Sequence, residues 1–518
     1  MIRHASCSLF FLSVLLVSQP HAAAQQEVGL WDRFETAVTN ARQYEDPFRD
    51  VRLDVTYSRP DGSTVDFWGF YDGDSTWRIR FMPDQTGEWR YEASFSDGAE
   101  GLRGTFDVVP SELPGMLSVE EDNPIWFGFK DGEPLLVRSF HVGDRFFAEN
   151  WDDPADEGDG EARTRFLNWV QRQGYNMLSV ASHYLNRDVD GRGARWDTPD
   201  LWLGDAERPE PAEYRKMETV LDTLAARHLM VYPFAGFFGK ESDYPRDEAD
   251  RELYVRYTLA RIAPYWNILL LVGGPEPLLD DNPYLTFEEV NDLGELIQRL
   301  DVFDHPLSVH NPGGGDPFME AAWLSYGTLQ GPKTLAYDEL SRGLRENHHP
   351  EKPLYAQETL WPGNMYHPDH TPETVRKSAY IMIMAAAAIN FADMDGDSSS
   401  GFSGTLDVDD RVQWRHDVVQ SVWDFFETVP LHRMRPRQDL VSSGYALAEV
   451  GSRYLVYLPE GGTVDLHLDG SEYSAEWINA QDPNDRRQGG LVPSGRGLAA
   501  PPDGDDWLLD LRVSPDSR

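Results

Sequence analysis

Two short stretches decide the fold of this chain, NILLLVGGPEP over residues 267–277 and PLYAQETLW over residues 353–361. Each is an apolar run that leads to a carboxylate, Glu276 in the first stretch and Glu358 in the second. An unbroken run such as ILLLV at 268–272 has no polar face, so it predicts a strand buried on both sides, as in a parallel sheet covered by helices. Both carboxylates are then expected just past the C-terminal ends of two strands, the edge where (β/α)8 barrels carry out chemistry.

Glu276 and Glu358 together would supply the two carboxyl groups that cleavage of a glycosidic bond requires. One carboxyl group protonates the leaving oxygen, and the other attacks the sugar or activates water. The alternative is that each glutamate is only a polar cap on a buried strand. Because the two carboxylates follow what count as strands four and seven, the pair favours catalysis over capping.

The segments around these stretches alternate between strand-like apolar runs and helical spacing, which predicts a (β/α)8 TIM barrel over residues 125–432. The expected strands are 134–142, 176–181, 229–237, 267–273, 307–310, 323–329, 354–357 and 389–392. The expected helices are 161–172, 213–227, 248–262, 287–300, 374–387 and 411–429.

Both flanks of this region read as short strands separated by turn residues. Residues 27–110 alternate strands with turns such as Pro60-Asp61-Gly62, and residues 437–514 return to the same pattern. Such spacing predicts an antiparallel β-sandwich on each side of the barrel, with 110–124 as a linker. A chain of 518 residues is long enough for these three domains.

The first 24 residues have the features of a secretory signal peptide. Arg3 and His4 precede an apolar run at 9–17, and Ala22-Ala23-Ala24 offers a small-residue cleavage site. The protein is therefore expected to be secreted or periplasmic in a bacterium. The run is too short to span a bilayer, so no membrane anchor is expected. Cys7 is the one cysteine and falls within this segment, so the mature protein would have no disulfide or thiolate metal site.

The charge balance excludes some classes of partner. The formal net charge is -42, with 46 Lys and Arg against 88 Asp and Glu. Nucleic-acid binding needs a basic footprint, so it is not expected, and an anionic lipid surface is disfavoured in the same way. The excess of acidic residues favours neutral glycans over anionic ones. The alternative is that this charge serves only the solubility of the protein. The sequence makes no prediction of the oligomeric state.

Two terminal segments resemble known domains. FETAVTNARQYEDPFRDVRLDVTY at 34–57 and GFYDGDSTWRIRFMPDQTGEWRYE at 69–92 resemble the N-terminal β-sandwich domain of unknown function that precedes many bacterial polysaccharide-degrading barrels. YALAEVGSRYLVYLPEGGTVDLHL at 445–468, with EWINAQDPN and PPDGDDWLLDL, resembles the C-terminal domain, named for collagen binding, of apiosidase-like glycoside hydrolases. These resemblances imply a secreted glycan-active enzyme whose last domain buttresses the barrel.

The order of the two glutamates resembles clan A of the retaining glycoside hydrolases. The resemblance implies that Glu276 is the acid/base after strand four and that Glu358 is the nucleophile after strand seven. The chain departs from the clan at Pro275, where those enzymes usually have an Asn that contacts the sugar hydroxyl next to the anomeric carbon. In this clan a Tyr often hydrogen-bonds the nucleophile, and Tyr326 in the expected sixth strand is the candidate here.

Further polar and aromatic residues near expected strand ends are candidates for binding sugar hydroxyls or sugar faces. For each, the alternative is a structural role in the core or in a hydrogen-bond network. The candidates are Arg138 and His141 after strand one, His183 and Asn186 after strand two, His310 and Asn311 after strand five, Trp361 as an aromatic platform after strand seven, and Asp393 and Asp395 on a rim loop after strand eight.

No cofactor or metal ion is expected. The run DMDGD at 393–397 has alternating carboxylates like a calcium loop, but it lacks the later bidentate Glu of an EF-hand. His367 and His370 are close in sequence without an evident third ligand, so a zinc site is not expected either.

These observations predict a secreted glycoside hydrolase that acts on a poly- or oligosaccharide by double displacement through Glu276 and Glu358. Two alternatives stay open. One is a non-catalytic glycan-binding protein that keeps the barrel as a scaffold, which the Gly273-Gly274-Pro275 run before Glu276 makes conceivable. The other is an inverting hydrolase in which an Asp, such as Asp393, replaces one of the glutamates.

Overall fold

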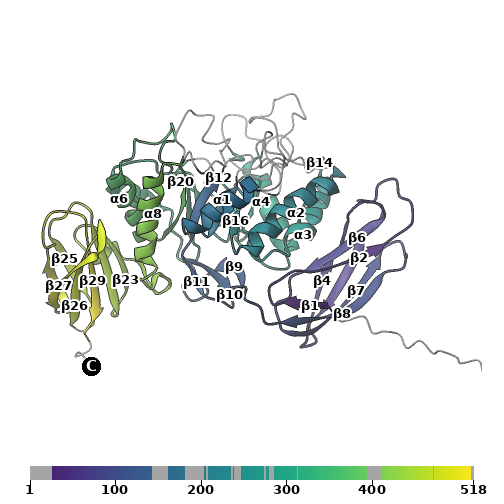
Figure 1. Ribbon diagram of the computed structural model, residues 1–518, viewed down its shortest axis with the longest axis horizontal. Coiled ribbons are helices and arrows are strands. Elements are labelled where there is room, and N and C mark those ends of the chain that lie inside the picture. Colours follow the sequence, from purple (N-terminus) through teal and green to yellow (C-terminus); the bar gives the residue numbers. More distant parts are fainter. Residues whose placement is uncertain are drawn as a thin grey trace, which may run out of the picture.

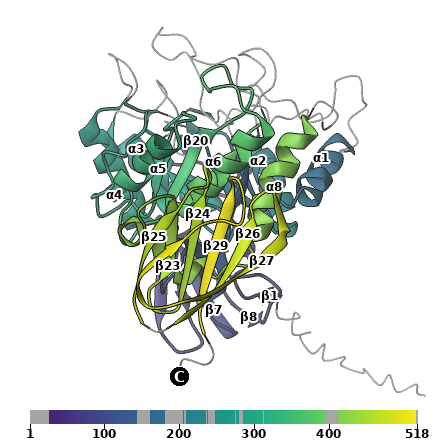
Figure 2. The same cartoon turned by 90° about the vertical axis from the view of Figure 1, so that its left-hand side faces the viewer.

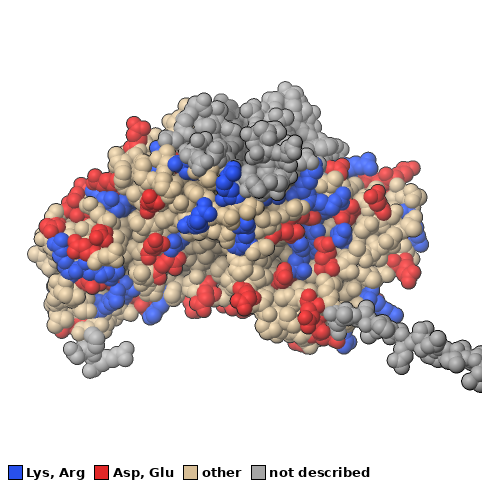
Figure 3. Space-filling model, viewed as in Figure 1, with Lys and Arg blue, Asp and Glu red and all other residues tan. Residues whose placement is uncertain are grey.

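The computed structural model describes residues 26–142, 161–180, 204–205, 208–234, 237, 247–273, 276–278, 285–311, 313–393, 408, 411–470 and 472–514. Figure 1 shows three parts side by side, with N-terminal strands at one end, helices and parallel strands in the middle, and C-terminal strands at the other end. Acidic and basic side chains are interspersed over the face seen in Figure 3. Within the described residues, no helix is long and apolar enough to cross a membrane.

The middle part contains a parallel sheet of six strands in the order β16-β13-β12-β21-β20-β19. A parallel pair, β17 and β18, continues from β16 through a parallel bridge between Val231 and Ile268. The strands are almost entirely buried, as their apolar runs predict. Their bounds are β12 Arg138–Val142, β13 Met177–Val180, β16 Met230–Tyr232, β17 Leu270–Leu271, β18 Leu307–Ser308, β19 Gly327–Leu329, β20 Leu354–Leu360 and β21 Ala387–Phe391.

Amphipathic helices surround these strands. In α4 the Thr286 hydroxyl and the Glu289 carboxylate form a reciprocal capping box, and Val290, Leu293 and Ile297 on one face of the helix are buried. The helices are α1 Glu161–Arg172, α2 Pro211–Ala226, α3 Glu248–Ile262, α4 Phe287–Leu300, α5 Tyr337–Glu346, α6 Pro372–Met384 and α8 Gln413–Phe426, with 3-10 turns η2 Leu431–Arg433 and η3 Gln438–Leu440. A short strand, β14 Gly204–Asp205, pairs antiparallel with β15 Arg208–Pro209.

The N-terminal part consists of a five-stranded sheet, β1-β8-β7-β3-β4, and a three-stranded sheet, β2-β6-β5. Aromatic rings fill the space between the sheets, with Phe34 stacked on Phe106 at 3.9 Å and Tyr57 on Phe81 at 4.2 Å. The pairing is antiparallel except that β1 runs parallel to β8. The bounds are β1 Gln26–Gly29, β2 Phe34–Thr39, β3 Leu53–Ser58, β4 Thr64–Trp68, β5 Phe70–Tyr71, β6 Thr76–Phe81, β7 Gly87–Phe95 and β8 Leu102–Val109.

A buried network of charges joins the N-terminal part to α2 and α3. The Arg80 guanidinium on β6 donates to the Glu218 carboxylate on α2 at 2.8 Å, and Arg261 on α3 donates to the same carboxylate at 2.6 Å. Asp72 accepts from Arg261 at 3.0 Å and from Arg215 at 2.9 Å. Burial by itself would raise the pKa of Glu218, but the two arginines lower it to about 2. The carboxylate is therefore ionised and fully paired at neutral pH.

The C-terminal part is a six-stranded sheet, β22-β23-β24-β29-β26-β27, facing a two-stranded sheet, β25-β28. It lies beside α6, as Figure 2 shows, where Arg376 donates to Asp506 at 2.9 Å and the Tyr457 hydroxyl donates to the same carboxylate at 2.6 Å. The bounds are β22 Arg435–Pro436, β23 Tyr445–Glu449, β24 Arg453–Leu458, β25 Val464–Leu468, β26 Tyr473–Asn479, β27 Asp482–Val492, β28 Gly495–Ala499 and β29 Trp507–Val513.

Several expected element bounds are wrong. The expected linker at 110–124 contains β9, Met116–Val119, which pairs with β10, Phe127–Lys130, in a small antiparallel sheet. The expected strand at 134–142 is two strands, because β11, Pro134–Leu135, joins that small sheet and β12 starts only at Arg138. Helix α5 was not expected, since its N-cap residue Ala336 makes no side-chain capping bond and carries no N-terminal signal.

Replacing Glu218 with Gln is expected to lower the free energy of unfolding by about 3–5 kcal/mol, because Arg80 and Arg261 would stay buried without their counter-charge. Urea denaturation measures this change. The matched control is Glu88→Gln, since Glu88 pairs with Arg90 on the exposed surface at 3.1 Å. The control is expected to change stability by less than about 1 kcal/mol. Equal effects of the two variants would contradict the role of the network.

Candidate active site

The two glutamates of the opening stretches lie at the same edge of the parallel strands. Glu276 follows β17, is 9% exposed, and its backbone N–H donates to the His310 carbonyl at 2.8 Å. Its φ is +58°, a left-handed conformation that non-glycine residues adopt rarely and that is more frequent at functional sites. Glu358 is 3% exposed and lies within β20 rather than past its end, where the pairing with β21 shifts register between Ala356 and Leu360.

One amide group contacts both carboxylates. The Gln330 Nε2 atom donates to Glu276 Oε1 in a short hydrogen bond and lies 3.5 Å from Glu358 Oε1. The Lys333 Nζ atom donates to the other oxygen of Glu358, Oε2, at 2.8 Å. The structure thus brings Glu276 and Glu358 together, with a neutral donor between them and one cation beside Glu358.

The environment of Glu358 disfavours its charge. Burial raises its pKa, and the nearby carboxylate of Glu276 raises it further, whereas Lys333 and the Gln330 amide lower it. The pKa of Glu358 lies above the usual range of a glutamate. Lys333 and the Gln330 amide therefore favour the ionised form of Glu358 against the effect of burial.

Two predicted histidines lie beside the pair as neutral rings. Burial lowers the pKa of His310 to about 3, with the charge of Lys333 adding to the effect, and its Nε2 lies 3.7 Å from Glu358 Oε1. Burial likewise lowers the pKa of His141 to about 3, and its Nδ1 lies 3.1 Å from the Ser179 hydroxyl. Neutral imidazoles both donate and accept hydrogen bonds, which suits them to hydroxyl groups.

Buried ring nitrogens without a hydrogen-bond partner in the described structure gather around this edge. They are His141 Nε2, both nitrogens of His310, both nitrogens of His367 and His370 Nε2. A buried polar atom without a partner is costly unless water or a ligand satisfies it. The arrangement can therefore bind a ligand that carries several hydroxyl groups. No group of metal-ligating side chains is found among the described residues.

Two predicted substrate-binding residues instead make structural ion pairs. Arg138 begins β12, at the opposite end from the site, and its guanidinium donates to Asp424 on α8 at 2.8 Å. Asp393 accepts from Arg415 at 2.7 Å and from the Val412 backbone at 2.7 Å. Burial would raise the pKa of Asp393, but these bonds and the one with His416 lower it. Neither side chain is left to contact substrate.

Two predicted aromatic contacts are also wrong, because both rings belong to the core. The Tyr326 hydroxyl donates to the Leu270 carbonyl at 3.2 Å and not to Glu358. Trp361 is 0% exposed, its indole N–H donates to the Asn390 carbonyl at 3.1 Å, and His141 stacks on its ring at 4.4 Å. A ring that stacks on a sugar needs an exposed face, and Trp361 has none. The Trp361 ring instead packs against the imidazole of His141.

The other predicted binding residues have mixed outcomes. Asn311 is buried and donates to Asp316 at 3.2 Å, while its Oδ1 has no partner in the described structure. His183, Asn186 and Asp395 lie outside the described residues. Of the predicted binding residues, His310 lies against Glu358, and His141 and His310 both contact the Phe234 ring.

Sequence reasoning missed Gln330 and Lys333. Gln330 follows β19 directly and Lys333 lies in the same loop, just as Glu276 lies after β17. The rule that functional residues follow strand ends would have found them, had it been applied to the sixth strand as it was to the others. The candidate predicted there, Tyr326, instead lies directly before β19 and is buried in the core.

Comparison with known proteins agrees with this architecture. The family described as a domain of unknown function, DUF5060, matches residues 27–96. No curated protein sequence matches the chain. A candidate glycoside hydrolase from Bacteroides vulgatus superimposes with a TM-score of 0.74 at 18% identity, over 94% of this chain and 100% of that one. At this sequence identity, the similarity between the two chains shows a shared fold.

Two further solved structures share part of the fold. A glycoside hydrolase of family 5 from Bacteroides vulgatus has a TM-score of 0.56 at 16% identity, covering 78% of this chain and 95% of its own. A structure named glycoside hydrolase has a TM-score of 0.57 at 15% identity, covering 78% of this chain and 99% of its own. At these identities, function has to be argued from the site itself.

Replacing Lys333 with Met is expected to raise the pKa of Glu358 further, because the stabilising cation is lost while burial remains. The titration can be followed in the infrared carboxyl band that Glu358→Gln removes. The matched control is Lys352→Met, since the Lys352 ammonium donates to the carbonyls of Met319 and Ala321, at 2.6 and 2.8 Å, rather than to a carboxylate. An unchanged or lower pKa of Glu358 in the Lys333 variant would show that the ion pair does not stabilise its charge.

Proposed function

We propose that this protein is a glycoside hydrolase that cleaves a poly- or oligosaccharide with retention of configuration. The observation that carries the proposal is the contact of Gln330 Nε2 with both Glu276 and Glu358. One carboxylate oxygen accepts a short hydrogen bond from this nitrogen and the other lies 3.5 Å from it, so the two oxygens are no more than about 6 Å apart. Retaining enzymes separate their carboxyl groups by about 5–5.5 Å and inverting enzymes by about 6.5–9.5 Å. The shared nitrogen supports the retaining geometry.

In this mechanism the two carboxyl groups have different tasks. Glu276 gives its proton to the glycosidic oxygen as the bond to the anomeric carbon breaks, and a carboxylate oxygen of Glu358 bonds to that carbon. Water then gives a proton to Glu276 and attacks the same carbon, which releases Glu358. Lys333 stabilises the ionised Glu358 before attack and again when it leaves.

The histidines fit the binding of a neutral sugar. The unpartnered nitrogens of His141, His310 and His367 are buried. Burial, with the charge of Lys333 adding to the effect, lowers the pKa of His367 to about 3, so this ring is neutral like the other two. Neutral donors and acceptors complement hydroxyl groups without attracting a carboxylate. The substrate proposed is therefore a glycan whose bound sugar carries no charge.

The fold supports the same reading. Solved structures with similar folds are named as glycoside hydrolases, one of them of family 5. We propose a closed (β/α)8 barrel over residues 125–432, of the clan A type, between β-sandwiches at 27–110 and 437–514. The bridge between Val231 and Ile268, and the hydrogen bond from Ser325 N to Leu307 O at 2.7 Å, support closure on either side of β17 and β18.

We further propose that residues 1–24 are a signal peptide and that the enzyme acts outside the bacterial cytoplasm. The apolar run at 9–17 and the alanines at 22–24 support this proposal. A polysaccharide is too large to enter a cell intact, so an exported enzyme also fits the proposed substrate. Clan A and apiosidase-like kinship remain part of the proposal, supported by the sequence resemblances.

A screen of neutral poly- and oligosaccharides for released reducing ends tests the proposal. With a cleaved substrate in hand, Glu358→Gln and Glu276→Gln are each expected to lower kcat by about 10²–10⁴-fold or more. The matched control, Glu112→Gln, changes an exposed glutamate outside the site and is expected to keep full activity. Full activity in Glu358→Gln would remove the catalytic pair and favour a glycan-binding protein instead.

Azide rescue separates the two roles. In Glu358→Ala azide is expected to attack the anomeric carbon in place of the carboxylate and to give a glycosyl azide of inverted configuration. In Glu276→Ala azide is expected to attack the glycosyl-enzyme and to give the retained product from a substrate with a good leaving group. Proton NMR of the first product anomer in the wild type should show retention, and inversion would overturn the mechanism.

A further inference from the structure

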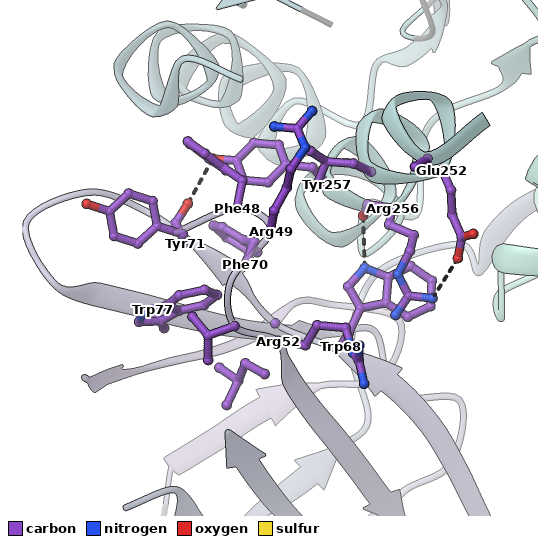
Figure 4. Close-up of a pocket in the computed structure, with 15 residues that line it drawn as sticks. Phe48, Arg49, Arg52, Trp68, Phe70, Tyr71, Trp77, Glu252, Arg256 and Tyr257 are labelled. Carbon is purple, nitrogen blue, oxygen red and sulfur yellow. Dashed lines mark hydrogen bonds and ion pairs between the residues drawn. The ribbon is translucent and has the colours of Figure 1, made fainter. Parts of the chain in front are cut away.

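A second pocket, which neither of the two glutamates lines, lies between the N-terminal part and α3. Its volume is about 540 Å³, within the range of about 300–1,000 Å³ typical of small-molecule sites. Figure 4 shows Tyr71 and Trp77 at one end, Trp68 with Arg256 at the other, and Phe48 and Phe70 between them. Both the N-terminal strands and α3 contribute side chains, so the pocket exists only when the two parts are joined.

One wall of the pocket is aromatic. The ring of Tyr71 packs against Trp77 at 5.4 Å, and Phe48 meets Tyr71 edge-on at 5.4 Å. Phe48 and Tyr71 are half-buried, while Phe70 and Trp77 are buried beneath them. The Tyr257 hydroxyl donates to the Tyr71 carbonyl at 2.9 Å and ties this wall to α3. Partly exposed aromatic rings in a concave site favour a ligand with an apolar face.

The opposite wall carries oriented polar groups. The Trp68 indole N–H donates to the Arg256 carbonyl at 2.9 Å, and the Arg256 guanidinium lies 4.0 Å from the centre of the Trp68 ring. Trp68 is therefore held in one orientation and is half-buried where it lines the pocket. Arg52 on the same side has a side chain that is 68% exposed. This wall offers hydrogen-bond donors opposite the aromatic rings.

The charges around the pocket are already paired. Arg49 pairs with Asp46 at 2.8 Å and also with Asp250, and Arg256 pairs with Glu252 at 3.8 Å. The guanidinium groups therefore keep carboxylate partners and leave little net positive charge for an anionic ligand. The net charge of -42 on the whole chain further disfavours an anion. A neutral ligand that combines an apolar face with hydroxyl groups matches both walls.

The position of the pocket suits a ligand that also reaches the catalytic edge. Helix α3 follows β16 in sequence, so it begins at the same edge of the sheet where Glu276 and Glu358 lie. The residues of α3 that line the pocket run from Ala249 to Tyr257, its first turns. The pocket is thus nearer to the catalytic edge than to the opposite end of the strands.

We propose that this pocket is a second carbohydrate-binding site, specific for a neutral glycan, that holds part of a polymer outside the catalytic centre. Sugar rings present apolar C–H faces for the aromatic wall and hydroxyl groups for Arg52 and Arg256. Binding at this pocket needs no catalytic step. The proposal therefore goes beyond the hydrolase function and can be tested separately from it.

Native affinity gels test this proposal with hydroxyethyl cellulose, glucomannan and xyloglucan as neutral probes and polygalacturonate as the anionic probe. The protein carries Glu358→Gln throughout, so that binding is measured without hydrolysis. At least one neutral polymer is expected to retard migration. Trp68→Ala is expected to weaken that binding about tenfold, from the lost ring contact.

A matched pair of arginine variants guards against loss of folding. Arg52→Ala removes an exposed lining side chain and is expected to weaken binding, whereas Arg90→Ala removes an exposed arginine of β7 outside the pocket and is expected to leave binding unchanged. In the otherwise wild-type enzyme, Trp68→Ala is expected to keep its activity on short soluble substrates while losing activity on the polymer that binds.

Each contrary outcome assigns the pocket differently. Retardation that Trp68→Ala and Arg52→Ala leave unchanged would locate binding elsewhere, and no retardation by any neutral polymer would overturn the site. If polygalacturonate alone retards migration of the protein, the ligand is anionic and the proposal of a neutral glycan is wrong. If sedimentation shows a dimer and Trp68→Ala dissociates it, the occupant of the pocket is a second copy of the chain, and the glycan proposal is wrong. A wild type that binds neutral glycans but hydrolyses none would reject the hydrolase proposal and leave this one standing.

Discussion

The burial of Glu358 is the constraint around which the candidate site is built. A carboxylate that is 3% exposed resists ionisation, and the neighbouring Glu276 adds to that resistance. Lys333 and the Gln330 amide offset part of this cost by direct bonds to the carboxylate. The nearby histidines stay neutral, so they supply hydrogen bonds without cancelling the charge of either glutamate. A buried, partly compensated carboxylate is the state that a nucleophile or an acid/base needs.

A second set of buried charges decides how the N-terminal part is held. Arg80 and Arg261 both bind Glu218, and Asp72 binds Arg261 from the other side. Such a network is geometrically demanding, because every member has to be satisfied at once. It keeps β5 and β6 against α2 and α3, and the aromatic pocket forms between β5, β6 and α3.

Sequence reasoning reached the pair Glu276 and Glu358 because apolar runs and the residues that follow them are local signals. It failed for Arg138 because the strand it belongs to starts four residues later than the apolar run, which moves the side chain to the opposite end. It failed for Trp361 and Asp393 for another reason. Residue type cannot distinguish a ring or carboxylate that faces a ligand from one that binds Asn390 or Arg415 internally.

The amino-acid sequence by itself determined the buried parallel strands, most of the helices around them and the two glutamates at one edge. These features depend on hydrophobic periodicity and capping, which act between residues close in the chain. Only the tertiary structure decided that Gln330 and Lys333 contact the glutamates, although Gln330 is 54 residues from Glu276 in sequence. It also decided which histidines are neutral and where the second pocket forms, because burial and pairing depend on segments that folding alone brings together.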